Sequence, residues 1–398
     1  MWDVRKTRYL IYLQIIVMVC LLPATAAVIG KPEKVYRIVY EIQTDEWYQQ
    51  QAALWKKEID KNPENPQAWM NYYNANRYAS FNNIGSKEKQ EKLNRIMEEM
   101  GKAIPESYEY LVLKYKTAGD LKDISLLEKA YALVPERPDT YYDLLTWYAV
   151  NGKQAKFEEF CEKLYHSKDI APWLMNYNYN MLMSVEPNAI LITNGDNDTY
   201  PAWLLQQVKN IRTDVTILNI SLASVKAFFD NTLKSRGINI TYEDLTSRAA
   251  KKTFTYFPAV LMQELVLEIT DKYPQVPVYF AVTVYSNSTE PFKADLYPVG
   301  LAFRYTRKRV DNIAMIKKNL ENNFILDYLR FDYLDDQFPG KNLSAKMNLN
   351  YISPIMLLAE HYFMSGEKEK AMEWKKIAVQ LAEKAGNKEA LDEINKKF

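Results

Sequence analysis

Apolar and aromatic residues recur at helical spacing through most of the first half of this chain. Tyr108, Leu111 and Tyr115 lie three and four residues apart, and a second set of the same spacing begins at Tyr141. Such spacing places side chains on one face of an amphipathic helix. Intervals of 33 and 34 residues separate both the prolines and the glycines between these stripes, namely Pro105, Pro138 and Pro172, and Gly85, Gly119 and Gly152. The pattern predicts a helix-turn-helix repeat of this period.

The C-terminal part of the chain carries a related pattern with small residues added. Residues 357–383 place small, aromatic, turn and small residues at Ala359, Tyr362, Gly366, Ala371 and Ala378. This arrangement resembles the tetratricopeptide repeat, in which small residues let antiparallel helices approach closely. The resemblance implies stacked helical hairpins. We expect about three repeats within residues 46–186 and at least one more in a C-terminal helical region at residues 308–398.

Between these helical regions the hydrophobic period changes. Residues 187–307 contain four apolar runs of strand length, at 189–193, 215–220, 278–283 and 299–305. Helical patterns lie between them at 201–208, 224–235 and 257–272. Strands that alternate with helices favour parallel pairing through right-handed crossovers. The predicted fold class is therefore α+α/β, with tetratricopeptide-like helical repeats flanking a small α/β domain that has a mostly parallel sheet.

A long amphipathic helix is predicted to lead from this domain back to the repeats. It covers residues 309–330, and its apolar residues are spaced to bury one face: Ile313, Ile316, Leu320, Phe324 and Tyr328.

The densest group of polar side chains follows the first predicted strand. Asn194 and Gly195 form a turn signal after residues 189–193, and four oxygen-bearing side chains come next. In open α/β sheets, ligands bind beyond the carboxyl ends of strands. The candidate ligand-binding residues are Asn194, Asp196, Asn197, Asp198, Thr199 and Arg212. Asp196 and Asp198 are also candidate ligands of a divalent cation, because hard cations prefer clustered oxygens.

The same segment has a structural interpretation, which we favour over metal binding and catalysis. Asp198 is expected to be the N-cap of a helix that tolerates Pro201 in its first turn, while Asn194, Gly195 and Asp196 shape the preceding turn. Because Asn is itself a good cap, replacing both aspartates by Asn is then expected to cost about 1 kcal/mol or less.

A second kind of candidate site lies on the repeat helices. First helices of such repeats line a concave face, where side-chain amides can hydrogen-bond the main chain of an extended peptide. The candidate groove residues are Asn71, Asn74 and Arg77 on one helix and Asn176 and Asn180 on another. Solvated polar faces would show the same pattern.

The α/β region resembles the soluble C-terminal region of bacterial multi-spanning membrane proteins whose membrane halves are similar to protein O-mannosyltransferases. Residues 191–222 (LITNGDNDTYPAWLLQQVKNIRTDVTILNISL) carry the resemblance, and residues 276–305 match a later part of the same region. The resemblance implies the fold and an exported location. It transfers no catalytic residue, since the sequence here has a single apolar segment near its start instead of a set of membrane spans.

The N-terminus predicts export. Arg5, Lys6 and Arg8 precede an apolar run that ends near Leu22, and Ala24-Thr25-Ala26 is a small-x-small cleavage pattern. Residues 1–26 are therefore expected to be a signal peptide, with an uncleaved membrane anchor as the alternative. The mature protein would be periplasmic, or anchored and facing the periplasm. Cleavage would leave Cys161 as its single thiol, which we expect to be a buried small hydrophobe.

Charge and composition narrow the function classes. Lys and Arg total 51 against 50 Asp and Glu, so the net charge gives no reason to expect a nucleic-acid partner. Only two histidines occur, His166 and His361, which argues against a zinc cluster or a Ser-His-Asp triad. We therefore expect an exported non-catalytic scaffold that binds a cell-envelope protein through its repeats, with the α/β module for docking or ligand sensing. The alternative is a metal-dependent enzyme or accessory subunit in envelope glycan transfer.

Overall fold

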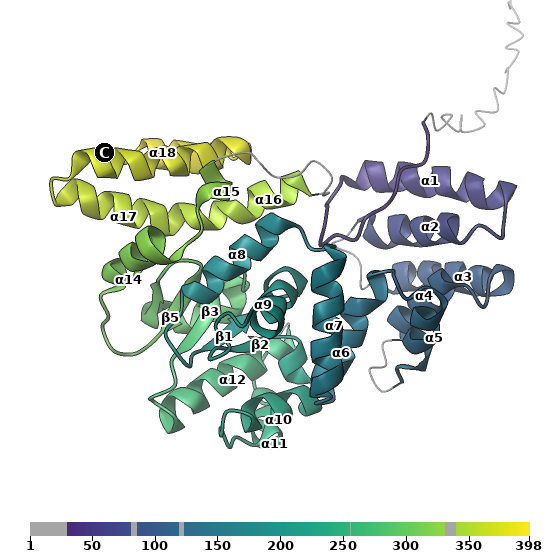
Figure 1. Ribbon diagram of the computed structural model, residues 1–398, viewed down its shortest axis with the longest axis horizontal. Helices are drawn as coiled ribbons and strands as arrows, with labels where there is room; N and C mark the ends of the chain where they lie inside the picture. The colour runs from purple at the N-terminus through teal and green to yellow at the C-terminus, as the bar shows by residue number, and fades with distance from the viewer. Residues whose placement is uncertain (1–29, 81–85, 119–122, 255, 331–339) are drawn as a thin grey trace, which may run out of the picture.

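The computed structural model describes residues 30–80, 86–118, 123–254, 256–330 and 340–398. The expected signal peptide or anchor at residues 1–26 lies outside these ranges. Helical hairpins flank a small sheet, which confirms the α+α/β fold class (Figure 1). None of the helices in the described ranges combines the length and apolar character needed to cross a bilayer.

The N-terminal helices pair as antiparallel hairpins, with α1 against α2, α4 against α5, and α6 against α7. Their bounds are α1 Asp45–Lys61, α2 Pro66–Tyr78, α3 Lys87–Ala103, α4 Tyr108–Ala118, α5 Ser125–Leu133, α6 Asp139–Val150, α7 Gln154–Ser167 and α8 Pro172–Met183. Local sequence sets several starts: the side chains of Thr44 and Asn65 accept hydrogen bonds from the first turns of α1 and α2, and Pro172 is the first residue of α8.

The sheet is mixed and has the strand order β2-β1-β3-β5-β4. Its strands are β1 Ile190–Thr193, β2 Thr216–Asn219, β3 Val278–Ala281, β4 Leu296–Pro298 and β5 Ala302–Tyr305. β1 pairs in parallel with β2 and β3, as the alternating pattern predicts. The run at 299–305 instead contributes the turn and second strand of a β4-β5 hairpin, which joins β3 antiparallel.

Helical connections join the three parallel strands. They are α9 Asp196–Lys209, η2 Leu222–Ser224, α10 Lys226–Lys234, α11 Tyr242–Ala249 and α12 Phe257–Lys272. Two short turns, α13 Ser286–Thr289 and η3 Glu290–Asp295, lead from β3 to β4. The C-terminal region then contains α14 Asn312–Lys318, a π-helical turn at Asn319–Asn323, α15 Asp327–Arg330, α16 Lys341–Asn348, η5 Leu349–Tyr351, α17 Ile352–Met364, α18 Lys368–Lys384 and α19 Lys388–Asn395.

The prediction of a single helix over residues 309–330 is wrong. α14 passes into the π-helical turn, and the chain becomes extended at Phe324 before α15 begins. Competing hydrogen bonds explain the break: the Asn180 side chain accepts from the Ile325 amide at 2.7 Å and donates to the Ile325 carbonyl at 2.8 Å. Both main-chain groups of Ile325 are thus bonded to Asn180 instead of along a helix.

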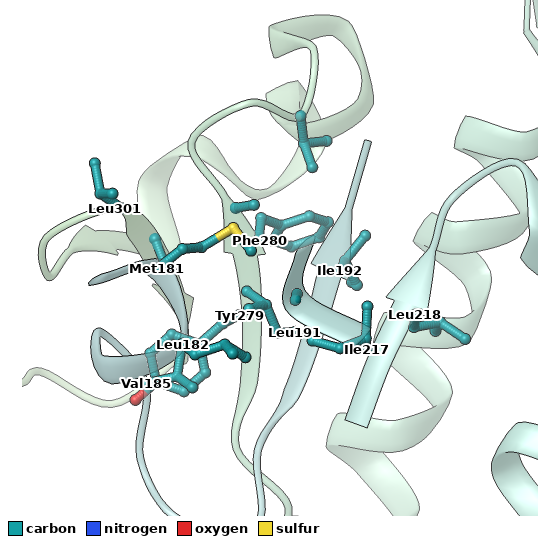
Figure 2. Close-up of a cluster of buried hydrophobic side chains, with 14 of the residues drawn as sticks. Met181, Leu182, Val185, Leu191, Ile192, Ile217, Leu218, Tyr279, Phe280 and Leu301 are labelled. Atoms are coloured by element: carbon teal, nitrogen blue, oxygen red, sulfur yellow. The ribbon is translucent and has the colours of Figure 1, made fainter. Parts of the chain in front are cut away.

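A continuous apolar core joins the end of α8, the sheet and the C-terminal helices. Met181, Leu182 and Val185 lie beside Tyr279 and Phe280 of β3, in the buried cluster that also holds side chains of β1 and β2 (Figure 2). Tyr351 extends this core to the C-terminal hairpin, where its ring meets Tyr177 at a centroid distance of 5.9 Å. The C-terminal helices therefore share one folding unit with the sheet.

The first helices have a core of their own. Residues of α1 to α4, including Trp69, Tyr73 and Met100, form a separate buried cluster with Val35 from the preceding segment. Figure 1 shows these helices on the opposite flank of the molecule from α17 and α18.

Replacing Tyr351 by Ala tests the docking of the C-terminal helices. Tyr351 is fully buried, and its hydroxyl lies 2.8 Å from the Asn180 amide nitrogen and 2.9 Å from the Tyr328 hydroxyl. The cavity and lost bonds should lower the free energy of unfolding by about 3 to 5 kcal/mol. Chemical denaturation would measure this. Met364→Ala is the control, because a side chain 86% exposed should change stability by less than about 0.5 kcal/mol. Equal stability of the two variants would contradict shared packing.

Candidate functional site

The acidic loop, residues 194–199, lies at the carboxyl end of β1, the middle one of the three parallel strands, and forms the start of α9. Asp198 is the third residue of α9, and its carboxylate points back toward the preceding turn. One oxygen accepts the Gly195 amide at 2.8 Å, and the other accepts the Asn194 amide at 2.7 Å. The Thr283 hydroxyl after β3 donates to this second oxygen as well. Asp198 therefore closes the β1-α9 turn and ties it to β3.

This geometry corrects the predicted N-cap of the helix. Gly195, not Asp198, is the N-cap, and α9 begins five residues before Pro201. Proline has no amide hydrogen, so Pro201 leaves the Asn197 carbonyl without its helical donor. The Asn178 side chain of α8 donates to that carbonyl at 2.8 Å. This substitute bond explains how the helix continues through Pro201.

Thr199 belongs to a buried hydroxyl and amide network beneath the loop. Its hydroxyl lies 2.8 Å from the Thr193 hydroxyl at the end of β1, and it accepts from the Asn219 amide at the end of β2 at 3.0 Å. All three side chains are at least 90% buried. The network joins the ends of β1 and β2, just as Asp198 joins those of β1 and β3.

Asp196 makes the one ion pair that this loop forms with a distant part of the described chain. Its carboxylate lies 3.1 Å from the Arg37 guanidinium, across 159 residues of sequence. Partial burial raises the pKa of Asp196, and the charge of Arg37 opposes the rise. The Asp196 side chain is 40% exposed and that of Arg37 is 20% exposed. Asp196 is thus already neutralised by a cation from the chain itself.

A small pocket opens beside this ion pair. It is lined by Val39, Tyr40, Tyr142, Ile170, Ala171, Trp173, Leu174, Asp196, Asn197, Tyr200 and Pro201. Tyr142 donates to Asp169 at 2.7 Å, and the Tyr40 hydroxyl contacts the same carboxylate. The pocket therefore lies where the N-terminal segment, α6, α8 and α9 meet, and it has an aromatic lining with two polar residues from the acidic loop.

Arg212 lies apart from the acidic loop. It precedes β2, at the amino end of the parallel strands, and forms a clamp over the connection from α8 to β1. Its guanidinium donates to the carbonyls of Leu182, Val185 and Glu186 at 2.7 to 3.0 Å, and pairs with Asp214 at 2.9 Å. The structure therefore brings together five of the six residues of the predicted ligand site and assigns Arg212 a separate structural contact.

Two of the side-chain amides predicted to line a peptide groove do bond main chain, but the main chain belongs to other segments of the same protein. Asn71 accepts the Val35 amide at 2.7 Å, and Asn180 holds Ile325 by two bonds. Asn74, Arg77 and Asn176 are half-buried on the same helices. The two helices lie in different parts of the molecule, so the five residues do not line one groove.

No three His, Cys, Asp or Glu side chains within the described ranges are grouped as metal ligands. Cys161 is buried, and burial raises the pKa of its thiol, which favours the neutral form. His166 and His361 are exposed on α7 and α17.

Arg37, Tyr40 and Tyr142 were not predicted as site residues from the sequence. They surround the acidic loop only after folding brings separate regions together. Arg37 sits in a segment without helical periodicity, and the single available signal was its charge in the otherwise apolar run RIVY.

Replacing Asp198 by Asn should lower the free energy of unfolding by more than the good capping ability of Asn suggests. Both carboxylate oxygens of Asp198 accept amide hydrogens, so one amide would face the Asn side-chain nitrogen. A loss of about 1 to 3 kcal/mol is expected for Asp198→Asn, against about 1 or less for Asp196→Asn, whose partly exposed ion pair is screened by water. Thermal unfolding with calcium, magnesium and manganese measures both effects. Cation-dependent stabilisation of the wild type that the double variant loses would establish a metal site instead.

The stability that the Arg212 clamp contributes should depend on pH through Asp214. Its hydrogen bonds with Arg212 lower the pKa of Asp214 to about 2. A lowered carboxyl pKa stabilises the fold above the ordinary value near 4, and this contribution disappears as the pH falls to about 2. The stability gap between wild type and Asp214→Asn should therefore be full at pH 5, at most about 2 kcal/mol because the side chain is 32% exposed. Denaturant titrations at several pH values measure the gap, which should close near pH 2. A gap independent of pH would contradict the assignment.

Comparison with known proteins matches the middle of the chain to one family model. The model of TMEM260-associated domain 2 matches residues 174–257, from the first turn of α8 to the first residue of α12. This segment includes the acidic loop and the Arg212 clamp. No curated protein matches the chain. Over residues 174–257 the chain is thus similar to a TMEM260-associated domain, which is consistent with the O-mannosyltransferase-like relationship.

Proposed function

We propose that this protein is an exported, non-catalytic scaffold that binds another cell-envelope protein through its helical repeats. The observation that supports the proposal is the use of side-chain amides on helices to hold extended main chain, by Asn71 on α2 and Asn180 on α8. Main-chain hydrogen bonds with side-chain amides recognise an extended segment largely without regard to its sequence. The same chemistry suits helices that receive a segment of a partner.

The helical hairpins are proposed to be tetratricopeptide repeats. In the C-terminal hairpin, Ala359, Tyr362, Ala371 and Ala378 are all buried, at 1% exposure or less. Gly366 has a φ of +87° in the turn between α17 and α18, a conformation that glycine adopts readily. Among the N-terminal helices, Gly152 has a φ of +63° after α6. These positions agree with the small, aromatic and turn residues of the repeat.

Export is proposed from the N-terminal sequence. The basic residues, apolar run and Ala24-Thr25-Ala26 pattern support a periplasmic protein or one anchored to the membrane and facing the periplasm. The match to a TMEM260-associated domain supports an association with membrane proteins, and the α/β module that contains it is the proposed docking or ligand-sensing element.

The competing proposal is a metal-dependent enzyme or accessory subunit in envelope glycan transfer. The accessory form rests on the resemblance of the α/β region to proteins with O-mannosyltransferase-like membrane halves. The catalytic form would need Asp196 and Asp198 to bind a cation together, yet Asp196 pairs with Arg37 and both oxygens of Asp198 accept main-chain amides. The geometry therefore favours the scaffold.

Photo-crosslinking in envelope fractions tests the scaffold. A photoreactive residue is placed in the full chain at Asn74 on α2 or at Met364 on α17, which is 86% exposed. Tyr285, which is 66% exposed in the α/β module, is the comparison position. A defined protein adduct from at least one helical position is expected, and an adduct from Tyr285 alone would assign binding to the module instead of the repeats. Mass spectrometry identifies the adduct. Absence of any adduct from both helical positions would contradict binding through the repeats.

A further inference from the structure

The segment before α1, residues 31–43, crosses the first helices and is named the strap. It runs without helix or strand as far as Arg37 and then turns at residues 38–40, where the Tyr40 amide donates to the Arg37 carbonyl at 2.9 Å. The Glu33 amide donates to the Gln51 side chain at 2.7 Å, and the Glu33 carbonyl accepts from the Trp55 indole at 2.8 Å. Two residues later, the Val35 amide donates to Asn71 at 2.7 Å. Alternate residues of an extended chain face the same side. The Val35 and Arg37 side chains therefore face the helices, whereas Glu33 contacts them through its main chain and its side chain is exposed.

Arg37 ends this row in a site made of carboxylate and aromatic groups. Its guanidinium pairs with Asp196 at 3.1 Å and lies 4.8 Å from the centre of the Tyr142 ring. Asp143 lies near enough to stabilise the positive charge further. A planar guanidinium suits both partners, since it bonds carboxylates and stacks on aromatic faces. The site selects arginine by charge and shape.

The surface that holds the strap is named the channel, and it consists of Gln51, Trp55, Asn71, Tyr142 and Asp196. The strap fits this channel incompletely. Within residues 31–43, Val35 is the one buried residue, at 3% exposure, while Glu33 and Lys34 are exposed. The Nη1 atom of Arg37 is buried without a hydrogen-bond partner. An unbonded buried donor weakens the attachment. Val35 is therefore the single fully buried anchor of the strap, and Ile38 packs against the same core while partly exposed. A competing segment would have to replace these contacts.

We propose that the channel beneath the strap is a binding site for an extended peptide of a partner protein, with a small β-branched residue two positions before an arginine. The strap occupies the site as an internal ligand until the partner replaces it. This inference rests on the proposed scaffold function and specifies its site. Charge complementarity supports this occupant: Asp196 and Asp143 face the arginine position, and the Asn71 and Gln51 side chains read main chain.

A synthetic peptide with the strap sequence, KPEKVYRIVYEIQ, tests the site. The test variant, called the unseated variant, is the full chain with Val35→Asp and Arg37→Glu. These two changes remove the contacts that hold the strap on the channel. Fluorescence anisotropy should show this variant binding the labelled peptide about 10-fold or more tightly than the wild type, because the strap lowers the fraction of open channels. Lys34→Ala in the peptide is the matched control and should bind equally, since Lys34 faces away from the helices.

A coupling experiment locates the arginine. Adding Asp196→Asn to the unseated variant should weaken binding of the parent peptide about 10-fold, and should leave a peptide with Arg37→Ala nearly unaffected. Equal losses for both peptides would overturn the assigned arginine site. A folded unseated variant that binds no peptide, or binds a scrambled peptide equally, would overturn the channel.

Hydrogen exchange of the wild type keeps the test decisive if the unseated variant does not fold. Saturating peptide should accelerate exchange of the Glu33 and Val35 amides, which lose their partners when the strap leaves. Unchanged exchange at millimolar peptide would overturn the proposal. A crosslinked envelope partner that strap peptide fails to displace would reject the channel and keep the scaffold. Peptide binding without any envelope adduct would keep the channel and reject the scaffold.

Discussion

Main-chain polar groups inside this protein must find partners wherever the chain leaves helix or strand, because an unbonded buried amide or carbonyl is costly. Side-chain amides meet this requirement at several junctions. Asn178 bonds the carbonyl that Pro201 leaves open, Asn180 holds Ile325, and Asn319 donates to the Ser184 and Val299 carbonyls. The contacts between α8, the sheet and the C-terminal helices therefore combine these bonds with apolar packing.

The same requirement explains the acidic loop. Three parallel strands end beside one another, and the turn after β1 needs acceptors for its amides. Asp198 supplies them, while Thr199 and Asn219 join the neighbouring strand end. A cluster of oxygens at a strand end is thus explained by turn formation, although the same composition suits a cation site. Asp196 differs, because its bond is to the strap and contributes nothing to the turn.

Sequence patterns predicted those parts of the fold that depend on local periodicity. The bounds of α12 agree with the predicted helix at 257–272, and β1, β2 and β3 lie within the predicted runs. The patterns failed where distant groups decide. Nothing near Phe324 indicates that Asn180, 145 residues away, will bond Ile325 and end the helix. The polar residues of the acidic loop were found from composition, whereas the Arg37 partner of Asp196 depends on tertiary contact alone.

The separate core of the first helices has a consequence for the energetics of the chain. Cluster residues of α1 to α4 do not merge with the core around the sheet, and polar contacts of Arg37 and Tyr40 bridge part of the boundary. Cooperative units of this kind open independently when few apolar contacts join them. We therefore expect α1 to α3 to form a foldon that opens while the sheet stays folded, with α4 at the boundary because its Tyr115 belongs to the core around the sheet. Any force applied through the N-terminal segment would reach this foldon first.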